Sequence, residues 1–446
     1  MRAFVVLGEE RTPARQSTQG HAPADDSLYA MSALASPSTT SPLAELLAAG
    51  GVRSVYQPVV ALPDRRVSAY EALARGPVGS PLESPGALFG AAAAEGTTAD
   101  LDRACRVAAV DGARGALDPS TALLVNVEPD VLDPGPATPA PLLERAGELS
   151  VIAEITERRL TDRPAELLRA VAALRRRGWG FALDDVGADW RSIALMPFLR
   201  PDVVKLDMGL VQEPFGAEAA AVVRAVRAYA DETGAAVLAE GIETEEHERR
   251  ALSWGATLGQ GWLYGRPAPL PAVPVVGGVA GGLVTAAAPV GTRTPAQVAQ
   301  AAGATFSVAP KGALLAHSIA IEHRALADPD PVVAFGCFQA ARHFTPATAR
   351  RYARLARRSA FVGAFGAGLD DTPVAGVRGA SLRTNEDLAG EWNVIVVGPH
   401  QAAALIAVDL GDSGEDMHRR FAYALIEDRD LVLRAARSLM LRITGA

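Results

Sequence analysis

Two adjacent carboxylates at the end of an apolar run are the feature that most limits which folds this chain can adopt. The stretch Phe181–Gly187 places Asp184 and Asp185 after three apolar residues and ends in a glycine that permits a sharp turn. An apolar run of this length predicts a buried strand. A strand with two acids at its carboxyl end offers hard oxygen ligands on a rigid element, as a divalent-metal site requires. Taken alone, this stretch could also be a solvated turn. The choice between a metal site and a turn depends on whether polar residues recur at the ends of other strands.

Short apolar runs alternate with helical segments from residue 42 to residue 267. In Ala217–Glu232, for example, Val222, Val226 and Tyr229 fall on one face at helical spacing. Repeated strand–helix alternation with eight candidate strands predicts an α/β fold, a (β/α)8 TIM-like barrel rather than a doubly wound sheet. The predicted strands are Val55–Val60, Val67–Leu73, Ala122–Val127, Val151–Thr156, Phe181–Val186, Val203–Met208, Ala236–Gly241 and Ala256–Gly261. The predicted helices are Leu101–Gly115, Ala165–Arg177, Ala217–Glu232 and Glu245–Trp254.

Polar side chains recur at or near the carboxyl ends of these strands, where a parallel barrel builds its active site. A charged residue inside an apolar strand is costly unless it is paired or binds a metal. Carboxylates and one amide, without Cys or His, favour Mg²⁺ or Mn²⁺ over zinc. Several acids around two ions form the arrangement used for displacement at phosphorus. Lys205 either pairs with these acids or activates an attacking water. The set is Glu71, Asn126, Glu154, Asp184, Asp185, Lys205, Glu240, Glu243 and Gln260.

Eight short motifs follow one another in this region. They are Tyr56–Val59, Tyr70–Arg75, Val125–Val127, Glu154–Glu157, Asp184–Gly187, Lys205–Asp207, Ala239–Thr244 and Gln260–Gly261. In this order they resemble the EAL domain family, which hydrolyses cyclic di-GMP to linear pGpG on a barrel with one antiparallel strand near its start. The resemblance covers residues 42–267 and implies a phosphodiesterase that uses two Mg²⁺ or Mn²⁺ ions.

Each matching position takes an implied role from the family. The implied metal ligands are Glu71, Asn126, Glu154, Asp184, Asp185 and Glu240. The implied catalytic residues are Lys205, which activates water, with Glu157, which anchors the loop after the aspartates, and Glu243, which orders the site. The implied substrate-binding residues are Arg75, which contacts phosphate, with Gln57 and Gln260.

The loop after the aspartates departs from the family pattern. Asp189 stands where the family has glycine, and Arg191 stands where it has serine. If the position of Asp189 needs a positive φ, aspartate tolerates it less well than glycine. The family loop links metal binding to dimerisation, so a catalytically weak or inactive cyclic di-GMP receptor is the alternative function. Carbon-acid chemistry in an enolase-type barrel is a third hypothesis, which the motif order and Arg75 disfavour.

The sequence from residue 294 onward has a different pattern and predicts a separate, smaller α+β domain. The predicted helices are Pro295–Ala302, Gly312–Ala327, Pro346–Arg358 and Leu431–Ile443, and the predicted strands are Val332–Gln339, Phe361–Ala367, Trp392–Val397, Ala402–Val408 and Phe421–Ile426. The motifs Phe335–Gln339, Arg350–Ala356, Gly390–Val394 and Gly398–His400 resemble the DICT sensory domain. The resemblance implies a regulatory domain. Its ligand and the sign of its regulation stay open.

Composition limits the partners and surroundings of the chain. A formal net charge of −8 argues against binding to nucleic-acid polymers. Two cysteines cannot build a disulfide framework and favour a reducing, cytoplasmic setting. The uncharged stretch Ala268–Val290 holds four prolines and predicts a linker rather than a membrane span. We therefore expect a disordered leader over residues 1–42, the barrel over 43–267, a Gly/Pro-rich linker over 268–293 and the sensory domain over 294–446. The family resemblance is compatible with a homodimer, although the sequence specifies no interface.

Overall fold

The computed structural model describes residues 41–62, 64–128, 146–156, 163–213, 216–271 and 293–443. Most of the expected leader, most of the expected linker and the site candidate Glu157 therefore lie outside the described residues. No helix of the described ranges is both long and apolar enough to cross a membrane.

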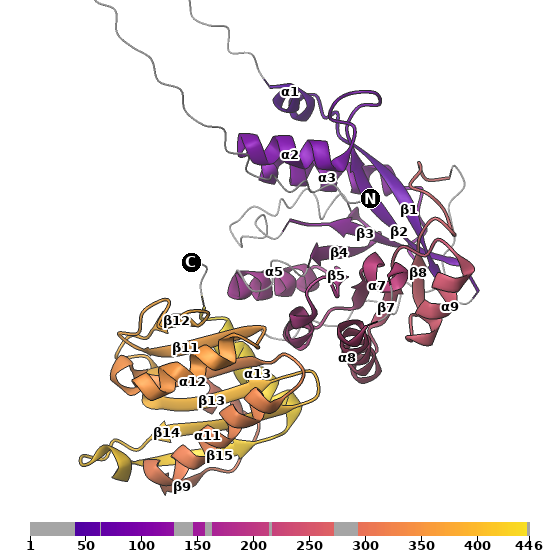
Figure 1. The fold of residues 1–446 in the computed structure, drawn as a ribbon. Coiled ribbons are helices and arrows are strands. Elements are labelled where there is room, and N and C mark those ends of the chain that lie inside the picture. The colour runs from indigo at the N-terminus through magenta and orange to yellow at the C-terminus, as the bar shows by residue number, and fades with distance from the viewer. Residues whose placement is uncertain are drawn as a thin grey trace, which may run out of the picture.

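The first part of the chain is a closed barrel whose strands pair in chain order (Figure 1). The first strand, β1 (Arg53–Ala61), runs antiparallel to both of its neighbours, and the remaining pairs are parallel. The other strands are β2 (Val67–Arg75), β3 (Ala122–Asn126), β4 (Ser150–Thr156), β5 (Gly180–Val186), β6 (Val203–Leu206), β7 (Ala236–Ala239) and β8 (Leu258–Gln260). The predicted barrel is confirmed, including its one antiparallel strand.

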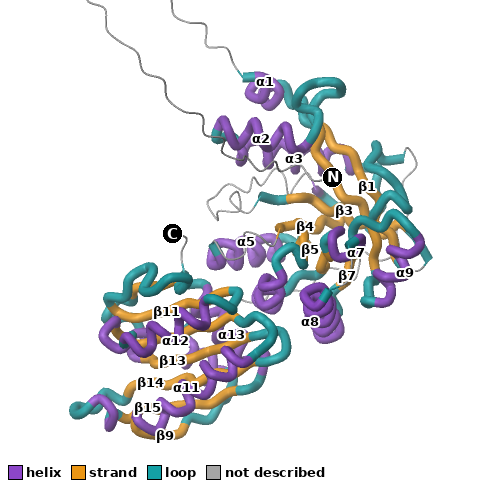
Figure 2. The backbone as a smooth tube through the Cα atoms, in the orientation of Figure 1, coloured by secondary structure: helices purple, strands orange, loops and turns teal. Residues whose placement is uncertain are grey.

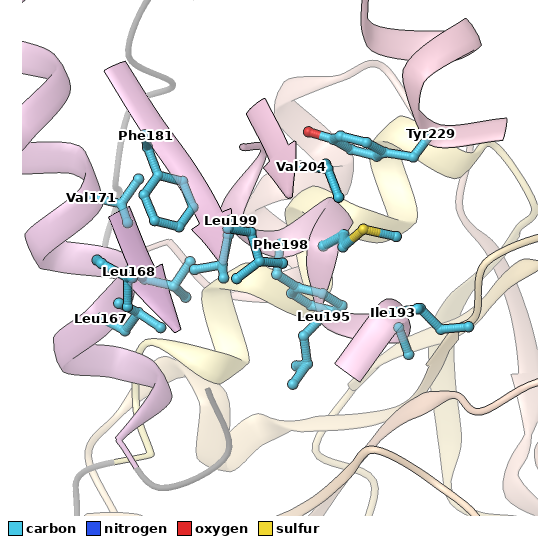
Figure 3. Close-up of a cluster of buried hydrophobic side chains, with 14 of the residues drawn as sticks. Leu167, Leu168, Val171, Phe181, Ile193, Leu195, Phe198, Leu199, Val204 and Tyr229 are labelled. Atoms are coloured by element: carbon cyan, nitrogen blue, oxygen red, sulfur yellow. The ribbon is translucent and has the colours of Figure 1, made fainter. Parts of the chain in front are cut away.

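Amphipathic helices cover the outside of the barrel. In α5 (Pro164–Arg176), the buried residues Leu167, Leu168, Val171 and Leu174 lie on one face, and Figure 3 shows the first three close to Phe181 of β5. Each leucine buried in this way stabilises the fold by roughly 1.5–3 kcal/mol. The other helical elements of the described barrel are α1 (Pro42–Ala48), α2 (Pro85–Glu95), α3 (Thr98–Ala113), η3 (Trp190–Leu195), α6 (Met196–Leu199), α7 (Met208–Gln212), α8 (Ala217–Thr233) and α9 (Glu245–Ser253).

One layer of small and branched apolar side chains forms a buried cluster of strand residues. This layer consists of Val59, Ala69, Ala122, Leu124, Ile152, Ala182, Val203, Ala236, Leu238 and Leu258. Because strand side chains alternate with a period of two, the residue two positions later lies on the same face. This step leads from six members of the layer to Glu71, Asn126, Glu154, Asp184, Lys205 and Glu240, and from Leu258 to Gln260. A polar layer therefore lies directly above the apolar one.

The second part of the chain is a seven-stranded sheet with the strand order β12-β11-β10-β13-β14-β15-β9. Figure 2 shows these strands side by side with helices across them. The elements are α10 (Pro295–Ala301), β9 (Ser307–Pro310), α11 (Lys311–Ala327), β10 (Val333–Ala340), η5 (Ala341–His343), α12 (Pro346–Ala356), β11 (Phe361–Ala367), β12 (Arg378–Ser381), η6 (Asp387–Gly390), β13 (Glu391–Val397), β14 (Ala402–Asp409), η7 (Asp416–His418), β15 (Arg420–Ile426) and α13 (Arg429–Met440). The predicted α+β class is confirmed. The edge strands β9 and β12 were not predicted, because each has four residues and neither contains a buried apolar run.

The two parts share buried contacts. Phe198 of α6 meets Phe335 of β10 edge-to-face with ring centroids 6.5 Å apart. Arg169 on α5 donates a 2.9 Å hydrogen bond to the Leu441 carbonyl just after α13. The second part is thus packed on the barrel beside α5 and α6.

Candidate active site and metal centre

Lys205 lies at the centre of the polar layer. It comes from the short strand β6, and its side chain is 1% exposed. Its Nζ lies 2.8 Å from Glu154 Oε1, 2.9 Å from Asp184 Oδ1 and 2.8 Å from Glu240 Oε1. Glu71 Oε1 is farther away, at 3.9 Å. Four acids from four different strands or strand ends therefore converge on one ammonium group.

Two amide side chains position the Glu71 carboxylate. Asn126 Nδ2 donates to Glu71 Oε1 over 2.9 Å, and Gln260 Nε2 donates to Glu71 Oε2 over 2.7 Å. Gln57 lies opposite Glu71 in the antiparallel pairing of β1 with β2, but its amide donates to the Gly265 carbonyl over 3.2 Å. The two amides on Glu71 lock its orientation, because each of its oxygens is already an acceptor.

Glu154 has the least exposed side chain of the four acids around Lys205. Its side chain is 0% exposed, its Oε1 lies 2.8 Å from Lys205 Nζ, and its Oε2 has no hydrogen-bond partner among the described residues. A buried carboxylate with unsatisfied lone pairs is costly unless a cation coordinates it. This side chain therefore favours a metal ion as an additional partner.

Burial and mutual repulsion disturb the ionisation of the cluster. Burial raises the pKa of Glu154 well above its usual value, and the neighbouring acids add to the rise. Burial likewise raises the pKa of Glu240, to about 8. Burial alone would also raise the pKa of Glu71, but Lys205 and the two amides hold it below its usual value. The surrounding acids outweigh burial at Lys205 and raise the pKa of its ammonium well above the usual value. The site thus has more carboxyl groups than its one lysine can keep ionised.

The carboxylates of the aspartate pair and Glu240 lie close enough together to hold one metal ion. Asp184, Asp185 and Glu240 each place one oxygen within 4.8 Å of the others. Asp185 has a left-handed φ of 58°, and its backbone N–H donates to Asp184 Oδ1 over 3.0 Å. A non-glycine residue in this region costs free energy and is often found at functional sites. Oxygen donors alone, held on strand ends, fit Mg²⁺ or Mn²⁺.

Three other predicted residues lie less centrally. Arg75 at the end of β2 is half-buried, and its guanidinium donates to the Ala74 carbonyl over 2.8 Å. Burial and the neighbouring Arg53 lower the pKa of Arg75. Glu243 is exposed, and its backbone N–H, rather than its carboxylate, contacts His247. The structure therefore brings together all six proposed metal ligands with Lys205 and Gln260, while Arg75, Gln57 and Glu243 make other contacts.

The altered loop is not strained at the position that differs from the family. Asp189 has a φ of −125°, and its side chain caps η3 by accepting from the Arg191 backbone N–H over 3.1 Å. It also forms an ion pair with the Arg191 guanidinium at 3.1 Å. The positive φ belongs instead to Gly187, at 107°. The condition under which aspartate would strain this loop is therefore not met.

Trp262 and Arg266 were missed by the sequence reasoning. Trp262 follows β8 by two residues and is 48% exposed, and the Arg266 guanidinium lies 3.8 Å from its ring centroid. An exposed aromatic ring just beyond a barrel strand's carboxyl end is a signal that could have identified this stack, because loops at that end contribute to active sites.

Comparisons with known proteins agree with this geometry. A sequence model of the EAL domain matches residues 41–267, and one described as "Sensory domain in DIguanylate Cyclases and Two-component system", the DICT domain, matches residues 293–410. The cyclic di-GMP phosphodiesterase RocR of Pseudomonas aeruginosa is 36% identical over 121 residues, which cover 27% of this chain and 31% of RocR. The cyclic di-GMP phosphodiesterase NbdA of the same organism is 30% identical over 232 residues, which cover 49% of this chain and 29% of NbdA.

These alignments span about a third or less of each of the two relatives. Among solved structures, a calcium and cy-diGMP complex of Klebsiella pneumoniae BlrP1 is 29% identical, with a TM-score of 0.46, and covers 50% of this chain and 58% of BlrP1. Residues 41–267 make up about half of the chain, and a DICT domain follows them. The chain belongs to the EAL domain family.

Proposed function

We propose that the barrel is a phosphodiesterase that hydrolyses cyclic di-GMP to linear pGpG with two Mg²⁺ or Mn²⁺ ions, under regulation by the DICT domain. The observation that carries this proposal is the convergence of four carboxylates on one buried lysine at the end of the barrel, with a fifth carboxylate, that of Asp185, beside two of them. When all five are ionised they exceed Lys205 by four negative charges, which two divalent cations would balance. The names of RocR and NbdA support the substrate.

Each group of the site has a role in this proposal. The metal ligands would be Glu71, Asn126, Glu154, Asp184, Asp185 and Glu240. Bound ions would supply Lewis acidity and lower the pKa of the attacking water. Lys205 shares its carboxylate partners with any bound ion, so its Nζ would be released to hydrogen-bond that water. Arg75, which emerges from the same strand as Glu71, would bind a phosphate oxygen through its guanidinium.

Hydrolysis by the full chain tests the proposal. Incubation with cyclic di-GMP and either Mg²⁺ or Mn²⁺ should give pGpG, resolved by anion-exchange chromatography. Glu71→Gln should lower the rate by more than about 100-fold, because changes to residues that only support metal ligands already lower activity by about 10–100-fold. The matched control is Glu246→Gln on α9, whose carboxylate is exposed and 3.7 Å from Arg250. No product with either metal, from protein with a native circular dichroism spectrum, would contradict catalysis.

The same samples separate an enzyme from a receptor. A receptor would bind cyclic di-GMP in EDTA by calorimetry and release no product when metal is added. The unstrained φ of Asp189 supports the enzyme over that alternative. We also propose a cytoplasmic setting, because Cys105 and Cys337 are both free thiols. A homodimer is the remaining expectation, and light scattering on the full chain tests it.

A further inference from the structure

A cavity in the DICT domain lies far along the chain from the barrel's acids. It has a volume of about 320 Å³ and lies between α11, the start of α12 and the end of β10. This volume is at the lower end of the roughly 300–1,000 Å³ typical of small-molecule sites. Its apolar walls come from Leu315, Ile319, Phe338, Trp392 and Met417. Two of the five are aromatic, so the cavity is suited to a flat, apolar ligand body.

A buried carboxylate with one free oxygen lines this cavity. Glu322 of α11 is 1% exposed, and its Oε2 pairs with Arg351 Nε at 2.5 Å. Its Oε1 has no hydrogen-bond partner among the described residues. An unsatisfied buried acceptor costs about 1–3 kcal/mol. A ligand that donates an N–H to Oε1 would remove this cost.

Cationic side chains prevail at the rim. Lys311 Nζ pairs with Asp416 Oδ2 at 2.5 Å, whereas Arg342 is exposed and makes no ion pair within the described residues. With Arg351, three cationic groups line the cavity against the two carboxylates of Glu322 and Asp416. The excess positive charge at Arg342 favours an anionic group on the ligand.

We propose that this cavity binds a small aromatic acid that carries an N–H donor: the ring packs against Phe338 and Trp392, which are cross-strand neighbours on β10 and β13, the N–H donates to Glu322 Oε1, and the anionic group pairs with Arg342. The conformation of Gln339, a strand residue that borders the cavity, supports a binding site at this position. Gln339 has a left-handed φ of 63°, and Asp409 and Arg419 hold its side chain through hydrogen bonds of 3.0 and 3.3 Å. Such backbone strain is found preferentially at ligand sites.

Three probes test the class of ligand on the full chain. Indole-3-acetate has the ring, the N–H and the carboxylate; 1-methylindole-3-acetate lacks the N–H, and 3-methylindole lacks the carboxylate. Calorimetry in EDTA should show saturable one-to-one binding of indole-3-acetate, and each analogue should bind at least about tenfold more weakly, because each loses a charge-assisted hydrogen bond. Since the readout is binding without metal, it does not depend on whether the barrel hydrolyses cyclic di-GMP.

Matched arginine variants locate the site. Arg342→Ala should weaken indole-3-acetate binding about tenfold. Arg350→Ala removes an equally exposed arginine of α12 that does not line the cavity, and it should leave the affinity unchanged. The proposal is overturned if indole-3-acetate does not bind to folded protein, if all three probes bind equally, or if both arginine variants lose the same affinity.

Discussion

At the scale of the residue, Lys205 shows why the site needs a lysine rather than an arginine. The chain has 43 lysines and arginines, and only Lys205 and Lys311 are lysines. A compact ammonium group can be reached by carboxylates from several directions, whereas a guanidinium is flat and presents its donors in a fixed fork. The convergence of Glu71, Glu154 and Asp184 on Nζ from separate strands therefore requires lysine at this position.

Lys205→Arg keeps the charge and tests this requirement. We expect hydrolysis to fall by about 10²-fold or more, because the Nζ that orients water is lost. We also expect the free energy of unfolding to fall by about 1–3 kcal/mol, because a larger group is forced into a packed site. Urea titration in EDTA measures the second effect. Lys311→Arg is the same substitution at a less buried position, and an equal loss there would show that the site does not select lysine.

Asp185→Asn separates the backbone role of Asp185 from its role as a ligand. Asparagine accepts the left-handed φ of 58° as readily as aspartate, so we expect the variant to be as stable as the wild type in EDTA. Removing the charge should abolish most of the rise in melting temperature that Mn²⁺ causes, because ligand-linked stability follows affinity for the folded state. Thermal unfolding with and without Mn²⁺ checks both. A full Mn²⁺ response in the variant would exclude Asp185 from the metal site.

At the scale of the element, the segment after β5 connects the acids to the rest of the molecule. Gly187 turns the chain, η3 and α6 follow at once, and their residues Ile193, Leu195 and Phe198 are buried in the cluster of Figure 3. The turn therefore lies between the strand that carries Asp184 and Asp185 and a buried, packed segment that follows it.

Gly187→Ala tests the turn. A Cβ at this position would lie 2.4 Å from Leu210 Cδ1, and the φ of 107° is unfavourable for alanine. We expect a loss of about 1–3 kcal/mol in the free energy of unfolding. The control is Gly90→Ala in the middle of α2, where a Cβ meets nothing within 4 Å and a gain of roughly 0.5–1 kcal/mol is expected. Equal effects of the two substitutions, measured by urea titration, would show that the turn is not constrained.

At the scale of the whole molecule, the barrel and the DICT domain form a common core. Phe198 and Phe335 are both fully buried and belong to one hydrophobic cluster that spans the two parts. The altered loop lies at the same contact: Asp189 and Arg191 line a cavity of about 440 Å³ together with Arg357 and Arg358 of the DICT domain. The DICT domain thus contacts the segment that follows Asp184 and Asp185.

A double-mutant cycle on the two phenylalanines tests this common core. Phe198→Ala and Phe335→Ala should each cost about 3–5 kcal/mol, because each leaves a cavity. Their coupling energy should be about 0.5–1.5 kcal/mol, as for other aromatic pairs. Denaturant unfolding of the full chain, followed by fluorescence and circular dichroism, gives the values. Two independent transitions with zero coupling would show that the DICT domain is only tethered to the barrel.

Local patterns in the sequence were sufficient to predict the barrel and most of the residues that meet in the candidate site. Each strand of β2 to β8 carries its polar residue, or in the case of β7 is followed by it, on the face that its apolar neighbours define. A period of two therefore places Glu71, Glu154 and Lys205 in one layer once the barrel closes. The helices α5, α8 and α9 were predicted to within one residue at either end for the same reason: periodicity and terminal signals depend on neighbouring residues.

The tertiary structure alone decided which groups actually touch. The edge strands β9 and β12 form only through pairing with β15 and β11, and no local pattern predicted the left-handed φ of Asp185. The contact between Phe198 and Phe335 joins residues 137 positions apart in the sequence, and no local pattern encodes such a pairing. The sequence by itself determined the elements and their chemistry, because these depend on near neighbours. Packing determined the partners, because these depend on contacts between distant parts of the chain.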